Sequence, residues 1–501
     1  MTTTISEVTA AVDEVVASSA TNAESAQSTR QGFGSFTWLF TAGFAIGGFK
    51  VGSARLHDNS FFVHLTTGKW MLEHGAVPRV DYYSFAAAGE SFVAQSWLAS
   101  LVYGALDQSP VGGQGIRVLM GAIAAIIAVS TFRLALRITL DRKRAILVAL
   151  AAFGVIAAMF SARPLGFGLL GLCAVIWIVE APTSAIGKRP ELAIPIVMWL
   201  WGNVHGSMAL GYLYLALYLL ARAFDGSVAW RPGRERQLAI GTLLSVLAML
   251  ANPYGPKLLF FPLELIGRGE ALKDVVEWMS PNFHTAAGIA FGVFFAFAFI
   301  VIARGNRPSR TDVIVTLPFI LLSFWAVRNT AIAALVMVPM VSRSFSVDQR
   351  RNETQDLRVG RIAGVAILAL CTVFFALTFT QQPYDTQTYS RKAFGFLETN
   401  GLLGQKMLTT DANAGWVLAK YFPRQQVFMD DRFDMFPEAV ITDYATISRA
   451  RPGWDARLDH YEIQVVVWPT SNALTQVLAL DKRWDRAYRD VEWTVFTRSA
   501  T

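Results

Sequence analysis

Residues 121–160 read GAIAAIIAVSTFRLALRITLDRKRAILVALAAFGVIAAMF, and this stretch decides the fold. Two apolar runs, Gly121–Ser130 and Ala145–Phe160, flank the basic segment Arg137–Arg144. With their flanks, such runs approach the roughly 20 apolar residues that an α-helix needs to cross about 30 Å of hydrocarbon. The stretch therefore predicts two membrane helices joined by a charged turn.

The composition extends this prediction to most of the chain. The 501 residues are 53% hydrophobic and only 16% charged, which is more apolar sequence than the cores of a soluble protein can bury. We expect a polytopic α-helical membrane protein of about 11–13 transmembrane helices. The apolar spans lie near 36–54, 116–136, 145–161, 164–182, 192–204, 206–222, 237–252, 286–303, 312–326, 329–342 and 362–380.

The loops between these spans are of two alternating kinds. One kind is strongly basic and includes Arg137–Arg144, Arg222–Arg236 and Arg304–Arg310; the other is less basic and rich in Gly, Pro, Asn or His. Positive-inside logic places the basic loops in the cytoplasm. The net charge of +7 is thereby explained without a nucleic-acid partner. Cys173 and Cys371 lie in apolar runs, which excludes a disulfide framework for the soluble part and argues against a thiol mechanism.

The chain divides into three parts. Residues 1–32 are polar and predicted to be a disordered cytoplasmic tail without the apolar core of a signal peptide. Residues 33–380 form the membrane domain, with a large outer loop at 55–115. In that loop, 60–75 and 94–108 are expected to be helices lying on the outer membrane face; the second is too short for a clear crossing.

Residues 381–501 are predicted to form an extracytoplasmic α/β domain. Strands are expected at Lys406–Thr410, Gln425–Met429, Ile463–Trp468 and Trp493–Thr497, with helices near 413–421, 437–449 and 470–480. The second strand would end in Asp430-Asp431-Arg432, a position suited to a site. The alternative, a strand-end turn with an internal Asp–Arg pair, is the favoured explanation of these residues.

Unusual polar residues cluster at the outer ends of the predicted helices. Ionisable residues at membrane depth are costly and usually face a cavity or a partner. Because several separate loops contribute them to one face, we expect one polar cavity open to the outside. Its candidate members are Asp58, His64, Lys69, Arg163, Asn203, His205, Asn252, Tyr254, Glu277 and Arg328.

Each candidate also has a structural explanation. Asp58 would cap the helix that follows it, and Arg163 and Arg328 would reach lipid phosphates. His64 and His205 would be hydrogen-bonded structural histidines. The remaining alternatives are a helix stop at Asn252–Gly255 and interfacial anchoring by Glu277 and Trp278.

The set of segments resembles the GT-C superfamily of membrane glycosyltransferases, and within it a poorly characterised bacterial group related to protein O-mannosyltransferases and the aminoarabinose transferase. The resembling segments are Asp58–Gly75, Ser161–Pro164, Trp201–Gly206, Asn252–Gly255, Glu277–Trp278, Arg328–Asn329 and Met429–Arg432. Many members carry paired acids in the first loop, whereas here Asn59 follows Asp58.

The resemblance implies a multi-pass protein of the bacterial cytoplasmic (inner) membrane that transfers a sugar, with inversion, from a polyprenyl-phosphate donor. The acceptor would be an envelope glycan, lipid or protein. Asp58 would be the catalytic base. The donor phosphate would be bound by Arg163, Arg328, Lys69 and His205, and the remaining cavity residues would be His64, Asn203, Asn252, Tyr254, Glu277, Asp430, Asp431 and Arg432.

Two questions stay open at the level of sequence. No His, Cys, Asp and Glu set has the tight spacing of a metal site, so a divalent metal is unsupported although the cofactor is unknown. The same cavity would also suit a non-catalytic protein that binds or translocates a lipid-linked glycan, or a structural partner in envelope assembly.

Overall fold

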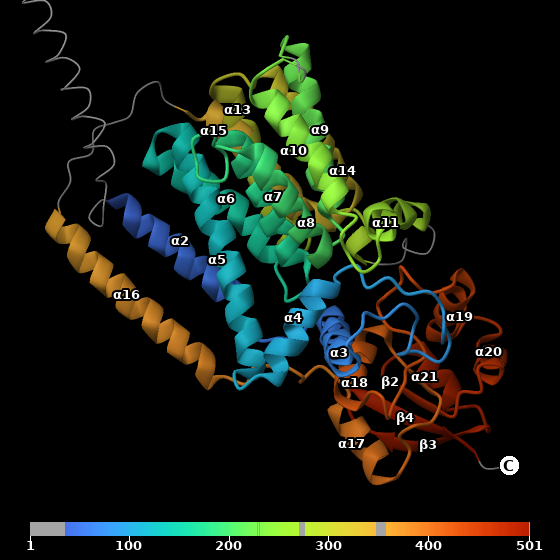
Figure 1. Ribbon diagram of the computed structural model, residues 1–501. Helices are drawn as coiled ribbons and strands as arrows, with labels where there is room; N and C mark the ends of the chain where they lie inside the picture. The colour runs from blue at the N-terminus through green and yellow to red at the C-terminus, as the bar shows by residue number, and fades with distance from the viewer. Residues whose placement is uncertain (1–35, 228, 230, 270–275, 347–356, 500–501) are drawn as a thin grey trace, which may run out of the picture.

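The computed structural model describes residues 36–227, 229, 231–269, 276–346 and 357–499. A large helical bundle occupies most of the molecule, and a smaller domain with one sheet lies beside it (Figure 1). The bundle and its outer loop contain α2 (Phe36–Gly52), α3 (Asn59–His74), α4 (Trp97–Gln108), α5 (Gly112–Thr139), α6 (Arg142–Met159), α7 (Leu165–Glu180), α8 (Pro190–Val204), α9 (Met208–Phe224), α10 (Arg234–Ala248), α11 (Pro256–Gly267), η1 (Val276–Trp278), α13 (Ala286–Arg304), α14 (Arg310–Trp325), η2 (Val327–Asn329), α15 (Thr330–Ser344) and α16 (Leu357–Thr380).

Each of the eleven predicted apolar spans coincides with a helix, namely α2, α5 to α10 and α13 to α16. Within the described residues, two helices are long and apolar enough to cross a membrane by the usual test, α5 and α13. The number of crossings therefore stays a prediction. The predicted disordered tail, 1–32, lies outside the described residues.

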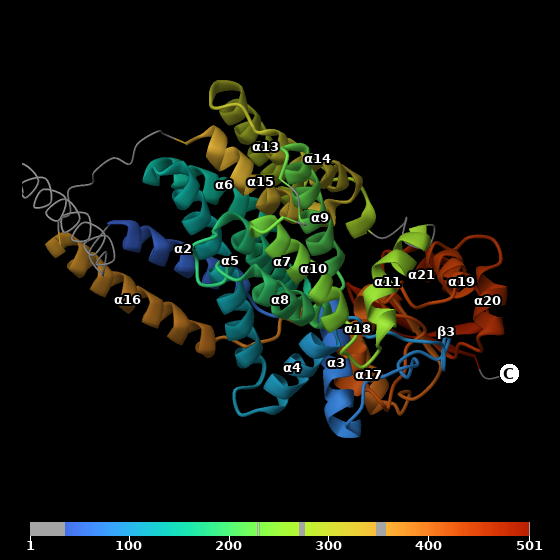
Figure 2. The same cartoon turned by 45° about the horizontal axis from the view of Figure 1, so that its top comes forward.

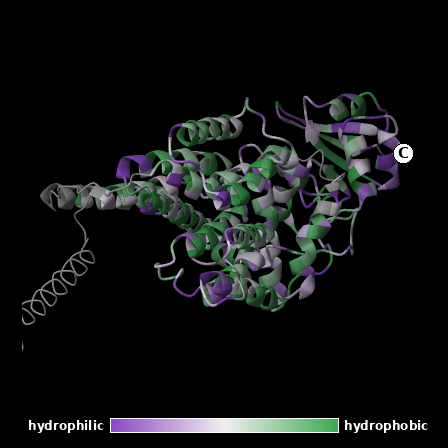
Figure 3. Ribbon diagram, turned by 90° about the horizontal axis from the view of Figure 1, so that it is seen from above, coloured by the Kyte–Doolittle hydropathy of each residue, from purple (hydrophilic) through white to green (hydrophobic). Residues whose placement is uncertain are grey.

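Many large apolar side chains lie on the surface of the bundle. Leu243, Phe299 and Leu321 are 69%, 68% and 60% exposed. Figure 3 shows hydrophobic residues along most of the bundle helices, while hydrophilic residues gather at turns and on the C-terminal domain. Such a continuous apolar exterior is typical of a surface that faces lipid.

The basic turns lie together at one end of the bundle. Arg144 donates from Nη1 to the Phe345 carbonyl oxygen at 2.8 Å, which joins the α5–α6 turn to the end of α15. Arg234 donates from Nη1 to the Gly187 carbonyl oxygen, also at 2.8 Å. The less basic turns lie at the opposite end, where the C-terminal domain packs. This grouping is the one that the charge pattern predicted, whichever side of a membrane each end occupies.

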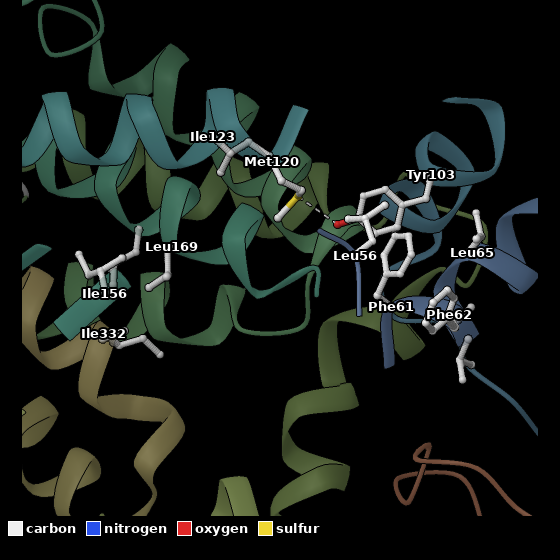
Figure 4. Packing of buried hydrophobic residues seen from close by; sticks show 14 of the residues in the cluster. Leu56, Phe61, Phe62, Leu65, Tyr103, Met120, Ile123, Ile156, Leu169 and Ile332 are labelled. Carbon is white, nitrogen blue, oxygen red and sulfur yellow. Dashed lines mark hydrogen bonds between the residues drawn. The ribbon is translucent and has the colours of Figure 1, made fainter. Parts of the chain in front are cut away.

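The two outer-loop helices cross at very close range. Gly68 of α3 and Gly104 of α4 face each other, and a Cβ on Gly68 would collide with the Ser100 carbonyl oxygen. Tyr103 continues this contact inward: its hydroxyl lies 3.3 Å from the Met120 sulfur on α5 (Figure 4). The outer loop is therefore a packed part of the bundle.

The C-terminal domain contains α17 (Arg391–Thr399), β1 (Met407–Thr409), α18 (Asp411–Tyr421), α19 (Glu438–Ser448), α20 (Trp454–His460), β2 (Val465–Pro469), α21 (Ala473–Leu478), β3 (Trp484–Arg489) and β4 (Trp493–Arg498). The strand order is β1-β2-β4-β3. β1 and β2 are parallel, and the other two pairs are antiparallel.

One predicted strand is wrong. Gln425–Met429 does not enter the sheet; instead Val427 pairs with the outer loop, accepting from Phe85 N and donating to the Tyr83 carbonyl oxygen at 3.1 Å each. Its apolar residues are buried against that loop rather than against neighbouring strands. The prediction also missed β3, α17 and α20, because β3 is mostly exposed and charged and both helices are short.

The C-terminal domain is fastened to the start of α3. Gly415 of α18 lies so close to Asn59 that a Cβ there would overlap the Asn59 carbonyl oxygen. A second link joins Leu56 N to the Pro383 carbonyl oxygen at 2.9 Å. Figures 1 and 2 both show α18 directly beside α3. The segment around Asp58 thus lies at the boundary of bundle and domain.

Candidate functional site

A cavity of about 490 Å³ opens at this boundary. It is lined by the start of α3, the α6–α7 and α8–α9 turns, η1, η2 and the C-terminal domain. The predicted site residues among its lining are Asp58, His64, Arg163, His205, Glu277, Arg328, Asp431 and Arg432. Residues from six separate chain segments are therefore brought together as expected, while their chemical roles stay predictions.

Asp58 and Arg163 form the centre of one wall. Both Asp58 carboxylate oxygens lie 2.8 Å from Arg163 Nε, and Oδ1 also accepts the Phe61 backbone N–H at 3.3 Å, which caps α3. On its other side, Arg163 Nη1 pairs with Glu277 of η1. The guanidinium therefore links two carboxylates from distant segments.

The turn that carries Arg163 is held by α4. The Tyr103 hydroxyl donates to the Ala162 carbonyl oxygen at 2.9 Å. Because Tyr103 is fully buried between α3, α4 and α5, it fixes the backbone directly before Arg163. Arg163 is thus oriented from both ends, by its turn and by its carboxylates.

Arg328 is different, because no hydrogen bond or ion pair joins it to another described residue. Its guanidinium stacks on Trp278, 4.7 Å from the ring centroid. Val327 N donates to the Met279 carbonyl oxygen at 2.8 Å, which ties η2 to η1 and keeps the stack in place. Burial lowers the pKa of Arg328 to about 10, with Arg163 adding to the effect, so Arg328 still carries its charge at neutral pH.

The two cavity histidines are neutral. Burial lowers the pKa of His64 to about 4 and that of His205 to about 3. The His205 Nδ1 accepts the Ser207 backbone N–H at 3.1 Å, so its proton lies on Nε2. His64 Nδ1 lies 2.9 Å from the Ser100 hydroxyl. Neither ring supplies a positive charge; His205 offers the cavity a neutral hydrogen-bond donor.

The segment Asp430-Asp431-Arg432 contains both a buried ion pair and residues that line the cavity. Arg432 donates from Nη2 to Asp81 at 2.7 Å and to Asp430 at 2.6 Å, and both carboxylates are fully buried. This cluster joins the outer loop to the C-terminal domain. Asp430 does not line the cavity; its role is to hold Arg432, which resembles the Asp–Arg pair that the sequence suggested.

Asp431 lies on the cavity side. Its Oδ1 is buried and has no hydrogen-bond partner among the described residues, and its carboxylate is close enough to Ser60 for a side-chain hydrogen bond. Burial and the neighbouring Asp430 raise the pKa of Asp431 to about 7. This carboxyl group therefore exchanges its proton near neutral pH.

Besides Asp430, four predicted site residues lie outside the cavity. Lys69 pairs with Asp107 at 2.6 Å on the α3–α4 contact and does not line the cavity. Asn203 is fully buried and accepts from Trp97 Nε1 at 2.8 Å, so it joins α8 to α4. Asn252 bonds only within its own turn. The Tyr254 hydroxyl donates to the Pro78 carbonyl oxygen at 2.7 Å and fixes the outer loop.

Sequence reasoning missed further lining residues, notably Ser60, Asp411 and Asp434. Asp434 continues the acidic run that begins at Asp430, and this continuation is the signal that could have found it. Burial raises its pKa. Asp411 accepts from the Tyr444 hydroxyl at 2.8 Å. With Asp431, these residues make the domain wall acidic, whereas Arg163 and Arg328 lie on the bundle wall.

No protein-family model and no curated protein matches the chain. Among solved structures, the Archaeoglobus fulgidus oligosaccharyltransferase in its apo form is 12% identical, with a TM-score of 0.53 over 86% of this chain and 69% of that chain. The same enzyme in complex with Zn and sulfate gives 12% and 0.50, covering 89% and 69%. ArnT from Cupriavidus metallidurans gives 13% and 0.39, covering 92% and 97%. The neighbours are GT-C glycosyltransferases, and the oligosaccharyltransferase structures confirm the GT-C-like fold that the sequence predicted.

The zinc in that neighbour raises the question of a metal here. Among the described residues, no three His, Cys, Asp or Glu side chains form a group that could hold a metal ion. The two cavity carboxylates that approach each other across the bundle wall, Asp58 and Glu277, already share the Arg163 guanidinium. The residues present do not fit a divalent ion at this position.

Proposed function

Given the GT-C fold, we propose that this protein transfers a sugar from a polyprenyl-phosphate donor to an envelope acceptor, at the outer face of the bacterial cytoplasmic membrane. The observation that carries the proposal is Arg328, a cavity-lining cation without a carboxylate partner among the described residues. A half-buried charge of this kind is costly unless an anion neutralises it. A donor phosphate is an anion of matching geometry.

The phosphate would lie between Arg328 and Arg163. Arg163 lies close enough to Arg328 to contribute to the lowering of the pKa of Arg328, and the neutral His205 adds an Nε2–H donor on the same wall. The oligosaccharyltransferase of similar fold binds sulfate, another tetrahedral anion. Cations positioned in this way stabilise the charge that develops on a departing phosphate.

The polyprenyl tail would leave along the apolar rim of the cavity. Leu265 of α11 and Val276 and Trp278 of η1 line it next to Arg328. α11 continues this rim outward, because Phe260 and Leu263 are 52% and 64% exposed. An apolar rim beside a cationic centre suits an amphipathic donor that carries its charge at one end of a long chain.

The reaction would be a single displacement with inversion. The acceptor oxygen attacks the anomeric carbon, the bond from that carbon to the phosphate oxygen breaks, and polyprenyl phosphate leaves toward the arginines. The acceptor must then approach from the opposite side, where the C-terminal domain supplies its acidic wall. The acceptor proton requires a carboxylate, a role for which the sequence proposed Asp58.

The test uses the full chain in lipid nanodiscs, with a panel of synthetic polyprenyl-phosphate sugars. Two quantities are measured: equilibrium binding of polyprenyl phosphate, and its release from each donor. We expect both binding and release. Binding without any release would support the alternative of a lipid-linked glycan carrier, and absence of binding would reject both.

A further inference from the structure

The two carboxylates nearest the reaction space are engaged very differently. Asp58 places both oxygens on Arg163 Nε and one of them also on the N-terminus of α3. These partners are positive, and both belong to the folded frame of the cavity. A proton taken up by Asp58 would compete with the hydrogen bond from Arg163 Nε, which holds that arginine on the donor side.

Asp431 has one carboxylate oxygen without a hydrogen-bond partner among the described residues. This oxygen, Oδ1, is buried, and Asp431 is one of the residues that line the cavity. A buried acceptor without a partner is costly, so a ligand group that donates a hydrogen bond would stabilise the site.

A second unpartnered atom lies next to it in sequence. Arg432 also lines the cavity, and its Nη1 is buried without a hydrogen-bond acceptor in the described part of the chain. One residue thus leaves an acceptor atom free and the next leaves a donor atom free. A hydroxyl group both donates and accepts, so the hydroxyl of an acceptor would satisfy the unpartnered Oδ1 of Asp431.

The backbone around Asp431 is firmly held. On either side of it, Asp430 accepts a hydrogen bond from Arg432, and Arg432 also donates to Asp81 in the buried cluster described above. The flanking side chains therefore fix the peptide, while the Asp431 carboxylate is left on the cavity side. A catalytic group held on a rigid frame needs no reorganisation at the moment of reaction.

We propose that Asp431, supplied by the C-terminal domain, is the general base that takes the proton from the acceptor hydroxyl, and that Asp58 acts as a positioning residue for Arg163. In this step the acceptor O–H bond breaks and its proton moves to Asp431 Oδ1. The oxygen forms the new bond to the anomeric carbon, and the electron pair of the broken glycosidic bond leaves with the polyprenyl phosphate. The inference rests on the proposed glycosyl transfer and deepens it.

The titration of Asp431 can be followed in the pH dependence of kcat. Its pKa is set by burial and by the charged groups around it. These groups come from its own segment, the α6–α7 turn and the start of α3: Asp430, Arg163 and Asp58. Since its pKa is about 7, the active, deprotonated base accumulates as the pH rises from 6 to 8. We expect kcat to rise through this range.

The experiment compares Asp431→Asn with Asp58→Asn in the full chain, in nanodiscs. Asn preserves the shape of both side chains and caps a helix as well as Asp does, and melting temperatures check folding. The acceptor probes are water and azide, and the readouts are release of polyprenyl phosphate and formation of glycosyl azide. Asp485→Asn removes a carboxylate from the exposed strand β3 of the same domain, away from the cavity lining, and serves as the matched control.

With water, Asp431→Asn should lose about 100-fold or more of kcat, lose the pH inflection, and keep its affinity for polyprenyl phosphate. Azide is already an anion and needs no base, so it should restore the rate of Asp431→Asn. Asp58→Asn should weaken polyprenyl-phosphate binding, keep the inflection, and gain nothing from azide.

Two results would overturn the assignment and leave the proposed function intact: an Asp431→Asn variant that keeps its rate and pH profile, or azide rescue of Asp58→Asn alone. A wild-type protein that neither binds polyprenyl phosphate nor releases it from any donor would overturn the proposed function itself, and the inference with it.

Discussion

Arg328→Gln should weaken binding of polyprenyl phosphate without harming the fold. The substitution removes the cavity cation that has no carboxylate partner in the described structure, so it leaves no carboxylate unpaired. Hydrogen bonds to a charged group contribute about 1.5–3 kcal/mol. At about 1.4 kcal/mol for each factor of ten, the dissociation constant should rise about 10- to 150-fold.

The effect on stability should be small, because only the stack on Trp278 is lost. A cation–π contact of this kind contributes about 0.5–1 kcal/mol at a partly exposed site. Arg79→Gln is the matched control. Arg79 likewise stacks on an aromatic ring, that of Tyr254 at 5.8 Å, but it does not line the cavity.

The assay is equilibrium binding of polyprenyl phosphate to the nanodisc-embedded protein, with thermal unfolding of each variant measured in parallel. Arg328→Gln should differ from the wild type in affinity, and Arg79→Gln should not. Equal affinities for Arg328→Gln and the wild type, with both proteins folded, would refute the reasoning that Arg328 is the phosphate-binding cation.

The remaining predictions concern the frame of the site. Arg432→Met should destabilise the protein by about 3–5 kcal/mol, because it leaves the buried Asp81 and Asp430 without a cation; a melting temperature equal to that of the wild type would contradict this. Gly68→Ala should overpack α3 against α4, lower the free energy of unfolding by about 1–3 kcal/mol and so lower the melting temperature. Gly47→Ala should leave the melting temperature unchanged, because a Cβ at that position meets nothing within 4 Å. Chelation of divalent metals should leave polyprenyl-phosphate release unchanged, because Asp58 and Glu277 are both already paired with Arg163. Loss of activity that an added metal restores would contradict this prediction.

The sequence was most informative about the helices of the bundle. The apolar runs predicted at 145–161 and 286–303 match α6 and α13 to within a few residues. A helix needs a long apolar segment whether it is buried in a bundle or in lipid, so these segments are visible in the sequence. It was least informative about the C-terminal domain. Gln425–Met429 has the composition of a strand, yet its partner is the outer loop, far away in the chain.

Site residues followed a similar division. Arg163 and Arg328 were conspicuous because charge is rare in their surroundings, and the structure brings both to one cavity. Lys69 was conspicuous for the same reason, but it forms an ion pair with Asp107 on another helix. No local sequence pattern predicts an ion pair between two helices. Asp430 lies in the ion-pair cluster of Arg432 and Asp81, whereas Asp431 lies on the cavity side. This difference depends on Asp81, which is far from both residues in the sequence.

The ion pair between Asp81 and Arg432 has a consequence for how the protein is made. The two residues are 351 positions apart, so at ordinary rates of translation Asp81 is synthesised about 20–70 s before its arginine. During that interval the nascent outer loop carries a carboxylate with no counter-charge. The cavity is therefore completed only after the C-terminal domain has been synthesised. A product of interrupted translation would expose the bundle wall of the cavity without the wall that the C-terminal domain forms.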